Sequence, residues 1–323
     1  MGPSRLSPTV TDHPPPVQPA AAMDITRGGV LVVDKPAGPT SHDVVAVVRR
    51  ALRGARVGHT GTLDPFATGV LPIVVGRATR LAQFLSHTDK AYEARISLGR
   101  ATDTYDFTGA TTFESADGRS WPSPHEIARA LTDVVGPVNQ VPPPFSAKKS
   151  GGVKAYERAR RGVPVALEPA AVTLHSLDVL AVDGHEICVR LVCSAGFYVR
   201  SLAHDLGVRL GTGAHLSALR RTRSGPFLVG DAVSLDSVVM NGPDLAGQIL
   251  PIDDLLPWLP AVSLTPDGVR YVLHGRDIGP DQLAGDAQPC WPPRLRLLGP
   301  GGALLAVAEP AAAGFLHPTV VLV

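Results

Sequence analysis

The segment AVTLHSLDVLAVDGHEICVRLVCS, residues 171–194, predicts the fold class of the chain. Two aliphatic runs flank Asp183–Gly184, and an Asp-Gly pair between such runs is a strong signal of a β-hairpin. The strands and helices predicted around this hairpin do not alternate strictly, which disfavours a doubly wound parallel sheet. We therefore predict an α+β fold with a largely antiparallel mixed sheet flanked by helices.

Hydrophobic periodicity outlines the elements around the hairpin. Alternating or continuous β-branched residues predict strands, whereas apolar residues three or four positions apart predict helices. The predicted strands cover residues 30–33, 69–76 and 90–99. The predicted helices cover residues 40–52, with Ser41 as N-cap, residues 77–87, residues 123–136, with Ser123 near the cap, and residues 196–211.

Composition divides the chain into three parts. Residues 1–27 are rich in proline and alanine and are predicted to form a disordered extension. A proline-rich boundary at residues 250–262 separates a large domain, residues 28–255, from a small one, residues 256–323. In the small domain, glycine and proline separate short aliphatic runs, which predicts an all-β unit.

The composition also excludes several classes of protein. The chain has 323 residues, of which 44% are hydrophobic, and this suffices for a buried core. No apolar run approaches the roughly 20 residues of a membrane-spanning helix, and the first residues lack a signal-peptide pattern. The three cysteines form no CxxC pair, so we expect neither a disulfide framework nor a zinc site. We expect a cytoplasmic protein.

Positive charge is concentrated before residue 231. The formal net charge is only +1, yet residues 231–323 hold ten acidic residues and four arginines. Two basic clusters lie in the preceding part, KKSGGVKAYERARR at residues 148–161 and LRRTR at residues 219–223. Such clusters attract phosphates, although a solvated helix face carries similar charge.

The loop VGHTGTLDPFATGVLP, residues 57–72, presents a single acid, Asp64. Its glycines permit positive φ or a close approach of the backbone to a ligand, and the proline after Asp64 favours an extended conformation of the acid. One interpretation is a plain turn in which the carboxylate bonds its own backbone. The other is a carboxylate held on a stiff, polar loop for chemistry.

A lone carboxylate restricts the chemistry available to this loop. A glycosidase normally needs a second carboxylate, and a hydrolytic metal site needs further ligands at suitable spacing. The sequence has no GxSxG motif of a serine hydrolase. Nucleophilic or general-base work by Asp64, beside a cationic partner, remains.

Six blocks of the sequence resemble the bacterial tRNA pseudouridine-55 synthases, the TruB-type family. The longest is GHTGTLDPFATGVLPIVVGRATR, residues 58–80. The others follow in the family's order: GVLVVDKPAGPTSHDVV (29–45), DKAYEARISLGRATDTYD (89–106), QVPPPFSAKKSGGVKAYERARRG (140–162), CSAGFYVRSLAHDLG (193–207) and GAHLSALRRTRSG (213–225). The resemblance implies the pseudouridine-synthase fold, and residues 256–323 loosely resemble a small RNA-binding domain of the PUA type.

The resemblance also implies the catalytic residues. Asp64 matches the family's catalytic acid, and Arg200 matches the arginine that pairs with it. Such a pair favours the ionised carboxylate and fixes its direction. Lys35–Pro36 matches a family signature that we interpret as support for the loop.

Five further residues match substrate-binding positions of the family. By this resemblance Tyr92 stacks on the target base, and Tyr198 and Leu219 line the uridine pocket. His59 contacts the RNA where the base has left the stack. Asp106, counted with the same group, is implied to lie near the arginine.

The reaction implied by the family needs neither a cofactor nor a metal. The bond between ribose and N1 of a uridine breaks, the base turns, and C5 rejoins the sugar. The implied partner is the T stem-loop of tRNA, without a membrane or a nucleotide cofactor, and we expect a monomer. Extruding the base costs a few kcal/mol, and stacking on Tyr92 can offset ~1–3 kcal/mol of this cost. The basic clusters are expected to contact phosphates.

Two alternatives stay open on the sequence alone. One is a non-catalytic RNA-binding or tRNA-folding module that uses the same groove. The intact set of Asp64, Arg200 and Tyr92 argues against it. The other is a synthase of the same fold that acts on another RNA, which the short C-terminal domain and the bacterial-type blocks disfavour.

Overall fold

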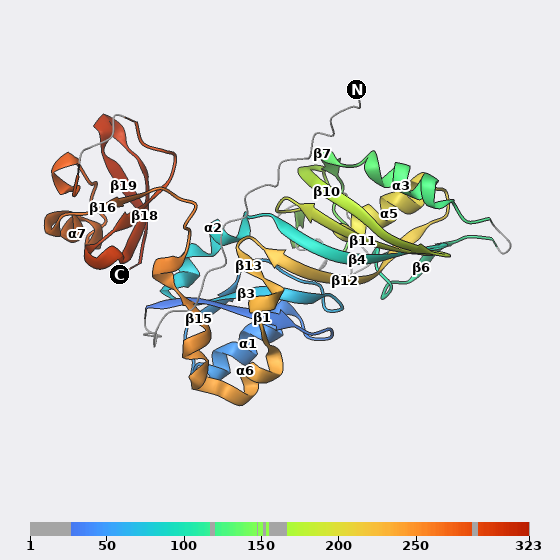
Figure 1. The fold of residues 1–323 in the computed structure, drawn as a ribbon, viewed down its shortest axis with the longest axis horizontal. Helices are drawn as coiled ribbons and strands as arrows, with labels where there is room; N and C mark the ends of the chain where they lie inside the picture. Colours follow the sequence, from blue (N-terminus) through green and yellow to red (C-terminus); the bar gives the residue numbers. More distant parts are fainter. Residues whose placement is uncertain are drawn as a thin grey trace, which may run out of the picture.

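The chain folds around two large sheets (Figure 1). The computed structural model describes residues 27–116, 120–146, 148–150, 153–154, 167–285 and 290–322. An eleven-stranded sheet lies in the first part of the chain, and a four-stranded sheet is formed after residue 260. The predicted extension, residues 1–27, lies outside the described residues except for Arg27.

The predicted hairpin is present near the middle of the chain. β10 (Ala170–Asp183) and β11 (Glu186–Cys193) pair antiparallel, with Asp183 opposite Glu186. The two loop residues are Gly184 and His185, and Gly184 has a φ of 56°, which glycine adopts at no steric cost. The turn thereby fixes the register of the hairpin.

The hairpin continues into a mixed sheet with the strand order β14-β1-β3-β12-β4-β11-β10-β7. The other strands of this path are β1 (Gly28–Lys35), β3 (Thr68–Gly76), β4 (Lys90–Leu98), β7 (Gly136–Gln140), β12 (Ala214–Ser224) and β14 (Val233–Ser234). The pairs β12–β3 and β1–β14 are parallel, and the remaining pairs are antiparallel. The predicted α+β class with a largely antiparallel mixed sheet is confirmed.

Each face of the large sheet has a core of its own. In β1, Leu31 and Val33 belong to one core, and Val30 and Val32 belong to the other, because successive side chains of a strand point to opposite faces. Helices cover the first core. The second core is covered in part by the C-terminal sheet.

The helices on the first face form two groups that stand apart in Figure 1. In one group, α1 (Ser41–Ala51) packs against α6 (Leu235–Asn241), which contacts β1. In the other, α3 (Pro124–Thr132) contacts α5 (Val199–Arg209), which lies on β12 and β4. The face therefore has two helical halves.

The cap of α1 differs from the prediction by one residue. Thr40, not Ser41, is the N-cap, because its hydroxyl accepts a hydrogen bond from the Asp43 amide. The Asp43 carboxylate in turn accepts one from the Thr40 amide, which completes a capping box. Ser41 is buried instead and points towards the loop that carries Asp64.

Two other predicted helices are shorter than expected. The segment 77–87 forms a 3-10 turn, η1 (Arg77–Leu81), followed by the short α2 (Ala82–Ser86). Ser123 caps α3 as predicted, but the helix ends at Thr132. The positive φ of Gly136, 116°, lies outside helical geometry, and that residue begins β7.

The C-terminal sheet packs on the second face of the large sheet. Its order is β16 (Ala261–Ser263), β17 (Leu295–Leu298), β18 (Leu304–Pro310) and β19 (Leu316–Val321). Leu304 and Val307 share a core with Val74 and Leu81. The prediction of an all-β unit is wrong in one respect, because the helix α7 (Pro266–Leu273) lies beside this sheet.

Short elements complete the fold. They are β2 (Val57–His59), β5 (Arg100–Thr102), β6 (Thr111–Glu114), β8 (Lys149–Ser150), β9 (Val153–Lys154), β13 (Phe227–Leu228) and β15 (Ile249–Pro251), with 3-10 turns at Val229–Asp231, Gly242–Gln248, Ile252–Asp254, Pro280–Gln282, Pro300–Gly302 and Ala312–Gly314. Among the described residues, every helix is too short or too polar to cross a membrane.

Gly69 marks a close approach between β3 and β12. Its φ is 102°, and it pairs with Arg221. A Cβ atom at this position would lie 2.2 Å from the Arg221 carbonyl oxygen. Gly38 has a similar φ of 108°, but a Cβ atom there would meet nothing within 4 Å.

We predict that Gly69→Ala lowers the free energy of unfolding more than Gly38→Ala does. Both substitutions introduce backbone strain of ~1–3 kcal/mol, whereas only the first adds a steric overlap of ~1–3 kcal/mol. Urea denaturation followed by circular dichroism measures the difference. Equal midpoints for the two variants would contradict the prediction.

Candidate active site

Three segments of the chain meet at one buried arginine. Arg200 lies in the first turn of α5, and its side chain is only 6% exposed. Its guanidinium makes four hydrogen bonds. Nη2 donates to Asp64 Oδ1 (3.0 Å) and to the Phe145 carbonyl (2.9 Å), and Nη1 donates to the Thr104 carbonyl (2.9 Å) and to Asp106 Oδ2 (3.4 Å). Nε lies 2.9 Å from Asp64 Oδ2 and completes the ion pair.

The pairing of Asp64 with Arg200 is bidentate, a geometry that fixes the direction of the carboxylate. The Asp64 side chain keeps 32% of its surface exposed, so a ligand can reach it. Burial raises the pKa of Asp64, while the Arg200 guanidinium opposes this rise. The site therefore presents an oriented acid at an open surface.

Asp106 is the second acid on Arg200, and only 4% of it is exposed. Its Oδ1 accepts hydrogen bonds from the hydroxyl groups of Thr104 (2.9 Å) and Thr108 (2.5 Å) and from the Thr108 amide (3.0 Å). Oδ2 is left to face Arg200. Asp106 thus lies beside the arginine, as the family resemblance implied.

Lys35 holds the backbone of the Asp64 loop. Its side chain is fully buried, and Nζ donates to the carbonyls of Pro36 (2.8 Å), Pro65 (3.0 Å) and Ala67 (2.7 Å). Three such bonds use all three protons of an ammonium group. Burial lowers the pKa of Lys35 to about 8, and the Asp64 charge opposes this shift. The prediction of a supporting role for Lys35–Pro36 agrees with these contacts.

Ser41 holds the same loop on its other side. Its hydroxyl donates to the Leu63 carbonyl (3.1 Å) and accepts from the Leu63 amide (2.9 Å). The backbone amide and the backbone carbonyl of buried Leu63 thereby both have a hydrogen-bond partner. The residue before Asp64 is consequently fixed by α1, which explains why Ser41 does not serve as the helix cap.

Tyr92 and His59 both lie near Arg221, which bonds the Asp64 loop. Tyr92 lies on β4, opposite Arg221, and is 8% exposed. Burial raises the pKa of its phenol, and the Asp64 charge adds to this rise. The His59 ring accepts a hydrogen bond from the Gly61 amide at Nδ1 (3.3 Å). Burial lowers the pKa of His59 to about 4, so its ring is neutral at neutral pH.

The two residues predicted to line the uridine pocket are Tyr198, at the start of α5, and Leu219, on β12. Tyr198 is the N-cap of α5, and Gln140 binds its backbone twice, through the amide (2.7 Å) and the carbonyl (3.0 Å). Burial raises the pKa of the Tyr198 phenol, and the nearby Arg200 opposes the rise. Leu219 packs in the same core as Tyr92. These side chains are available to line an apolar pocket.

This arrangement suits chemistry by one carboxylate. Asp64 is oriented by a cationic partner and can be reached from outside, and these are requirements of a nucleophile or a general base. Within the parts of the chain that the structure describes, no cluster of three His, Cys, Asp or Glu side chains is arranged to bind a metal ion.

Comparison with known proteins agrees with this geometry. Residues 49–199 match the TruB family pseudouridylate synthase N-terminal domain, and residues 200–257 match the tRNA pseudouridylate synthase B C-terminal domain. The chain is 42% identical over 281 residues to the tRNA pseudouridine synthase B of Syntrophotalea carbinolica, an alignment that covers 85% of this chain and 90% of that relative. The chain belongs to the TruB family of pseudouridylate synthases.

Other members and a solved structure extend the comparison. The chain is 48% identical over 250 residues to the tRNA pseudouridine synthase B of Symbiobacterium thermophilum, covering 76% of this chain and 82% of that one. A structure of an H/ACA RNP bound to a substrate RNA containing 2′-deoxyuridine matches with a TM-score of 0.69 and 25% identity, over 93% of this chain and 86% of that chain. The predicted pseudouridine-synthase fold is confirmed.

Arg221 has a different place in this TruB-family chain from the one predicted. It is 1% exposed, and it donates to the carbonyls of Val70 (2.7 Å) and Gly61 (3.1 Å). A side chain buried in this way cannot contact phosphates. It supports the loop that carries Asp64, a role that charge counting does not reveal.

The other predicted phosphate contacts are Arg220, Arg223 and the cluster at residues 148–161, and Arg223 donates to the Gly225 carbonyl (3.3 Å). Arg220 is occupied by a bidentate ion pair with Asp34, at 2.7 and 3.1 Å. The other basic cluster, residues 148–161, lies mostly outside the described residues. Its contact with RNA therefore stays a prediction.

Two residues that the sequence analysis missed support the site behind Asp106. Tyr105 has a φ of 64°, and its ring stacks on His204 of α5 with centroids 3.8 Å apart and planes 8° apart. A left-handed tyrosine is strained by ~1–3 kcal/mol, so the surrounding contacts must hold it. The residues before and after Tyr105 in this strained turn both accept hydrogen bonds from Arg200. Thr104 accepts through its carbonyl, and Asp106 accepts through its carboxylate.

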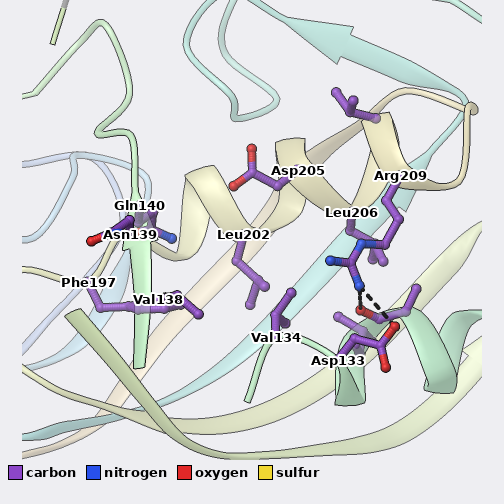
Figure 2. Close-up of a pocket in the computed structure, with 13 residues that line it drawn as sticks. Asp133, Val134, Val138, Asn139, Gln140, Phe197, Leu202, Asp205, Leu206 and Arg209 are labelled. Atoms are coloured by element: carbon purple, nitrogen blue, oxygen red, sulfur yellow. Dashed lines mark hydrogen bonds and ion pairs between the residues drawn. The ribbon is translucent and has the colours of Figure 1, made fainter. Parts of the chain in front are cut away.

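A cavity of about 430 Å³ lies between α5, α3 and β7 (Figure 2). Leu202 and Leu206 point into it, and the ion pair of Arg209 with Asp133 closes one end. Gln140, at the other end, is the residue that holds the backbone of Tyr198. None of the seven predicted site residues lines this cavity.

We predict that Arg221→Met lowers both thermal stability and kcat/KM, the latter at least about tenfold, whereas Arg220→Met changes each only slightly. The first substitution leaves two buried carbonyls unpaired, at ~1–3 kcal/mol each, and loosens the Asp64 loop. The second removes a surface ion pair worth ~0–1 kcal/mol. Differential scanning fluorimetry and a tRNA pseudouridylation assay on both variants measure the contrast. Similar losses for the two arginines would remove Arg221 from the support of the loop.

Proposed function

We propose that this chain isomerises a uridine of tRNA to pseudouridine, with the T-loop uridine at position 55 as its target. The observation that carries the proposal is the bidentate pair of Asp64 with Arg200 at an open surface. Membership of the TruB family supports the reaction, and relatives that align over most of the chain are named tRNA pseudouridine synthase B.

The reaction balances without a co-reactant. The N1–C1′ bond of the uridine breaks, the base rotates, and a C5–C1′ bond forms; C5 loses a proton and N1 gains one. An ionised Asp64 can attack C1′ or receive the C5 proton. Arg200 favours the ionised form of the acid against the effect of burial and aims the carboxylate for either step, and Asp106 orients Arg200 from the far side.

The substrate-binding residues follow from the same pocket. We assign Tyr92 to stacking on the extruded base, as the family resemblance implies. It lies on β4 opposite Arg221, the side chain that bonds the Asp64 loop at Gly61 and Val70. Tyr198 and Leu219 form the apolar walls. His59, neutral at neutral pH because burial lowers its pKa to about 4, contacts the RNA where the base has left the stack.

The remaining assignments belong to the same proposal. Residues 28–255 form the catalytic domain, and residues 256–323 form a PUA-like accessory domain. The acidic charge after residue 230 disfavours extensive phosphate contact by that accessory domain. We propose that the protein acts as a cytoplasmic monomer on tRNA without a metal or a cofactor.

We predict that the wild-type chain forms pseudouridine at the T-loop uridine of an unmodified tRNA transcript in the presence of a metal chelator, and that Asp64→Asn forms none. Asparagine keeps the size of the side chain but removes the nucleophilic and basic oxygen. The product is detected by chemical mapping of pseudouridine along the transcript.

The binding of the same transcript provides the control for this prediction. Asp64→Asn should still bind the RNA, as measured by filter binding. Binding without product from the wild-type chain would support the alternative of a non-catalytic RNA-binding or tRNA-folding module. Pseudouridine in another RNA, with none in tRNA, would support the alternative of a synthase of the same fold that acts on another RNA.

We predict that kcat/KM falls as the pH falls through the pKa of Asp64, which lies above its ordinary value of 3.8 because of burial. The raised pKa favours the neutral acid, so the active carboxylate is present above this pKa and lost below it. Arg200→Lys should move this acid limb to higher pH and lower kcat roughly 10- to 100-fold, because one charge-assisted hydrogen bond is lost. An unchanged profile in Arg200→Lys would separate Arg200 from the ionisation of Asp64.

A further inference from the structure

Two aromatic side chains lie at the rim of the Asp64–Arg200 site. Phe66 follows the Asp64–Pro65 dipeptide, and Phe107 follows Asp106 directly. Phe107 is 45% exposed, and Phe66 is half-buried. Both acids that bond Arg200 are therefore followed closely by a phenylalanine that reaches the surface.

The two rings form one surface. Their centroids lie 5.5 Å apart with planes at 80°, an edge-to-face contact that is favourable between aromatic side chains. The contact joins the loop that carries Asp64 to the turn that carries Asp106. Nearly half of the Phe107 side chain nevertheless stays open to solvent.

The backbone beneath this surface is fixed by neighbouring elements. The Phe107 amide donates to the Leu216 carbonyl (3.0 Å) in β12. On the other side, the Pro65 carbonyl accepts from the Gly38 amide (2.9 Å) and from Lys35. The rings are thus held on rigid supports, which reduces the entropy lost when a flat ligand binds.

We propose that Phe66 and Phe107 form a stacking platform for the nucleobase next to the target uridine, an inference that rests on the proposed function. When a uridine leaves its stack, the adjacent base loses a stacking partner. An aromatic ring replaces that partner and accepts any base, because every base has a π-face. The phenyl rings have no polar groups, so the platform contributes affinity and not base identity.

The test uses a T stem-loop transcript with 2-aminopurine directly 3′ of the target uridine, bound by Asp64→Asn so that no turnover occurs. Stacking quenches 2-aminopurine, so binding should change its emission. Adding Phe107→Leu should abolish this change and weaken binding about 5- to 50-fold. The matched control is Phe113→Leu, because Phe113 is 46% exposed on β6, and it should bind and quench like the parent.

The outcomes distinguish a stacking role of Phe107 from a purely structural one. If Phe107→Leu leaves the change in 2-aminopurine emission as it is, the platform is overturned. If the same variant also melts at a lower temperature, Phe107 contributes to packing alone. If the wild-type chain forms pseudouridine but the emission does not depend on Phe107, the platform is overturned and the proposed isomerase activity stands. Quenching that depends on Phe107, without turnover by the wild-type chain, overturns the isomerase and supports the platform.

Discussion

The guanidinium of Arg200 joins the parts of the chain that form the site. The Asp64 loop follows β2, beside α1, whereas Arg200 begins α5 in the other helical half. A buried cation is stable only when its hydrogen bonds are satisfied, and this one makes four of them besides an Nε ion-pair contact with Asp64. Asp64 therefore keeps its direction as long as the turn at Asp106 and the segment at Phe145 stay in place.

The site also uses basic residues as supports rather than as contacts for RNA. Lys35 and Arg221 are both buried, and both bond carbonyls of the segment between Gly61 and Val70. The Lys35 charge also lies near enough to Asp64 to favour the ionised form of that acid. Counting basic residues along a chain therefore overstates the surface available to nucleic acid when several of them hold a loop from inside.

Much of the fold follows from local sequence, and the exceptions have physical causes. The Asp183–Gly184 pair predicts the hairpin, and alternation predicts β4. The residues of the site were indicated by turn chemistry around Asp64 and by the family blocks, not by composition. Ser41 was misplaced because Thr40 offers the same hydroxyl one residue earlier, and only Asp43, three residues on, distinguishes the true cap. No local pattern marks the left-handed Tyr105, since tertiary contacts hold it there.

The position of β12 has a consequence for the synthesis of the chain. β12 (Ala214–Ser224) lies between β3 and β4, which precede it by more than a hundred residues. On the ribosome, β3 and β4 thus emerge long before the strand that joins them. The edge of β4 that β12 covers stays unpaired in the meantime, whereas β2 already pairs with part of that edge of β3. Contacts this distant in sequence also form slowly. A nascent or truncated chain that ends before β12 therefore has no continuous sheet and is prone to aggregate.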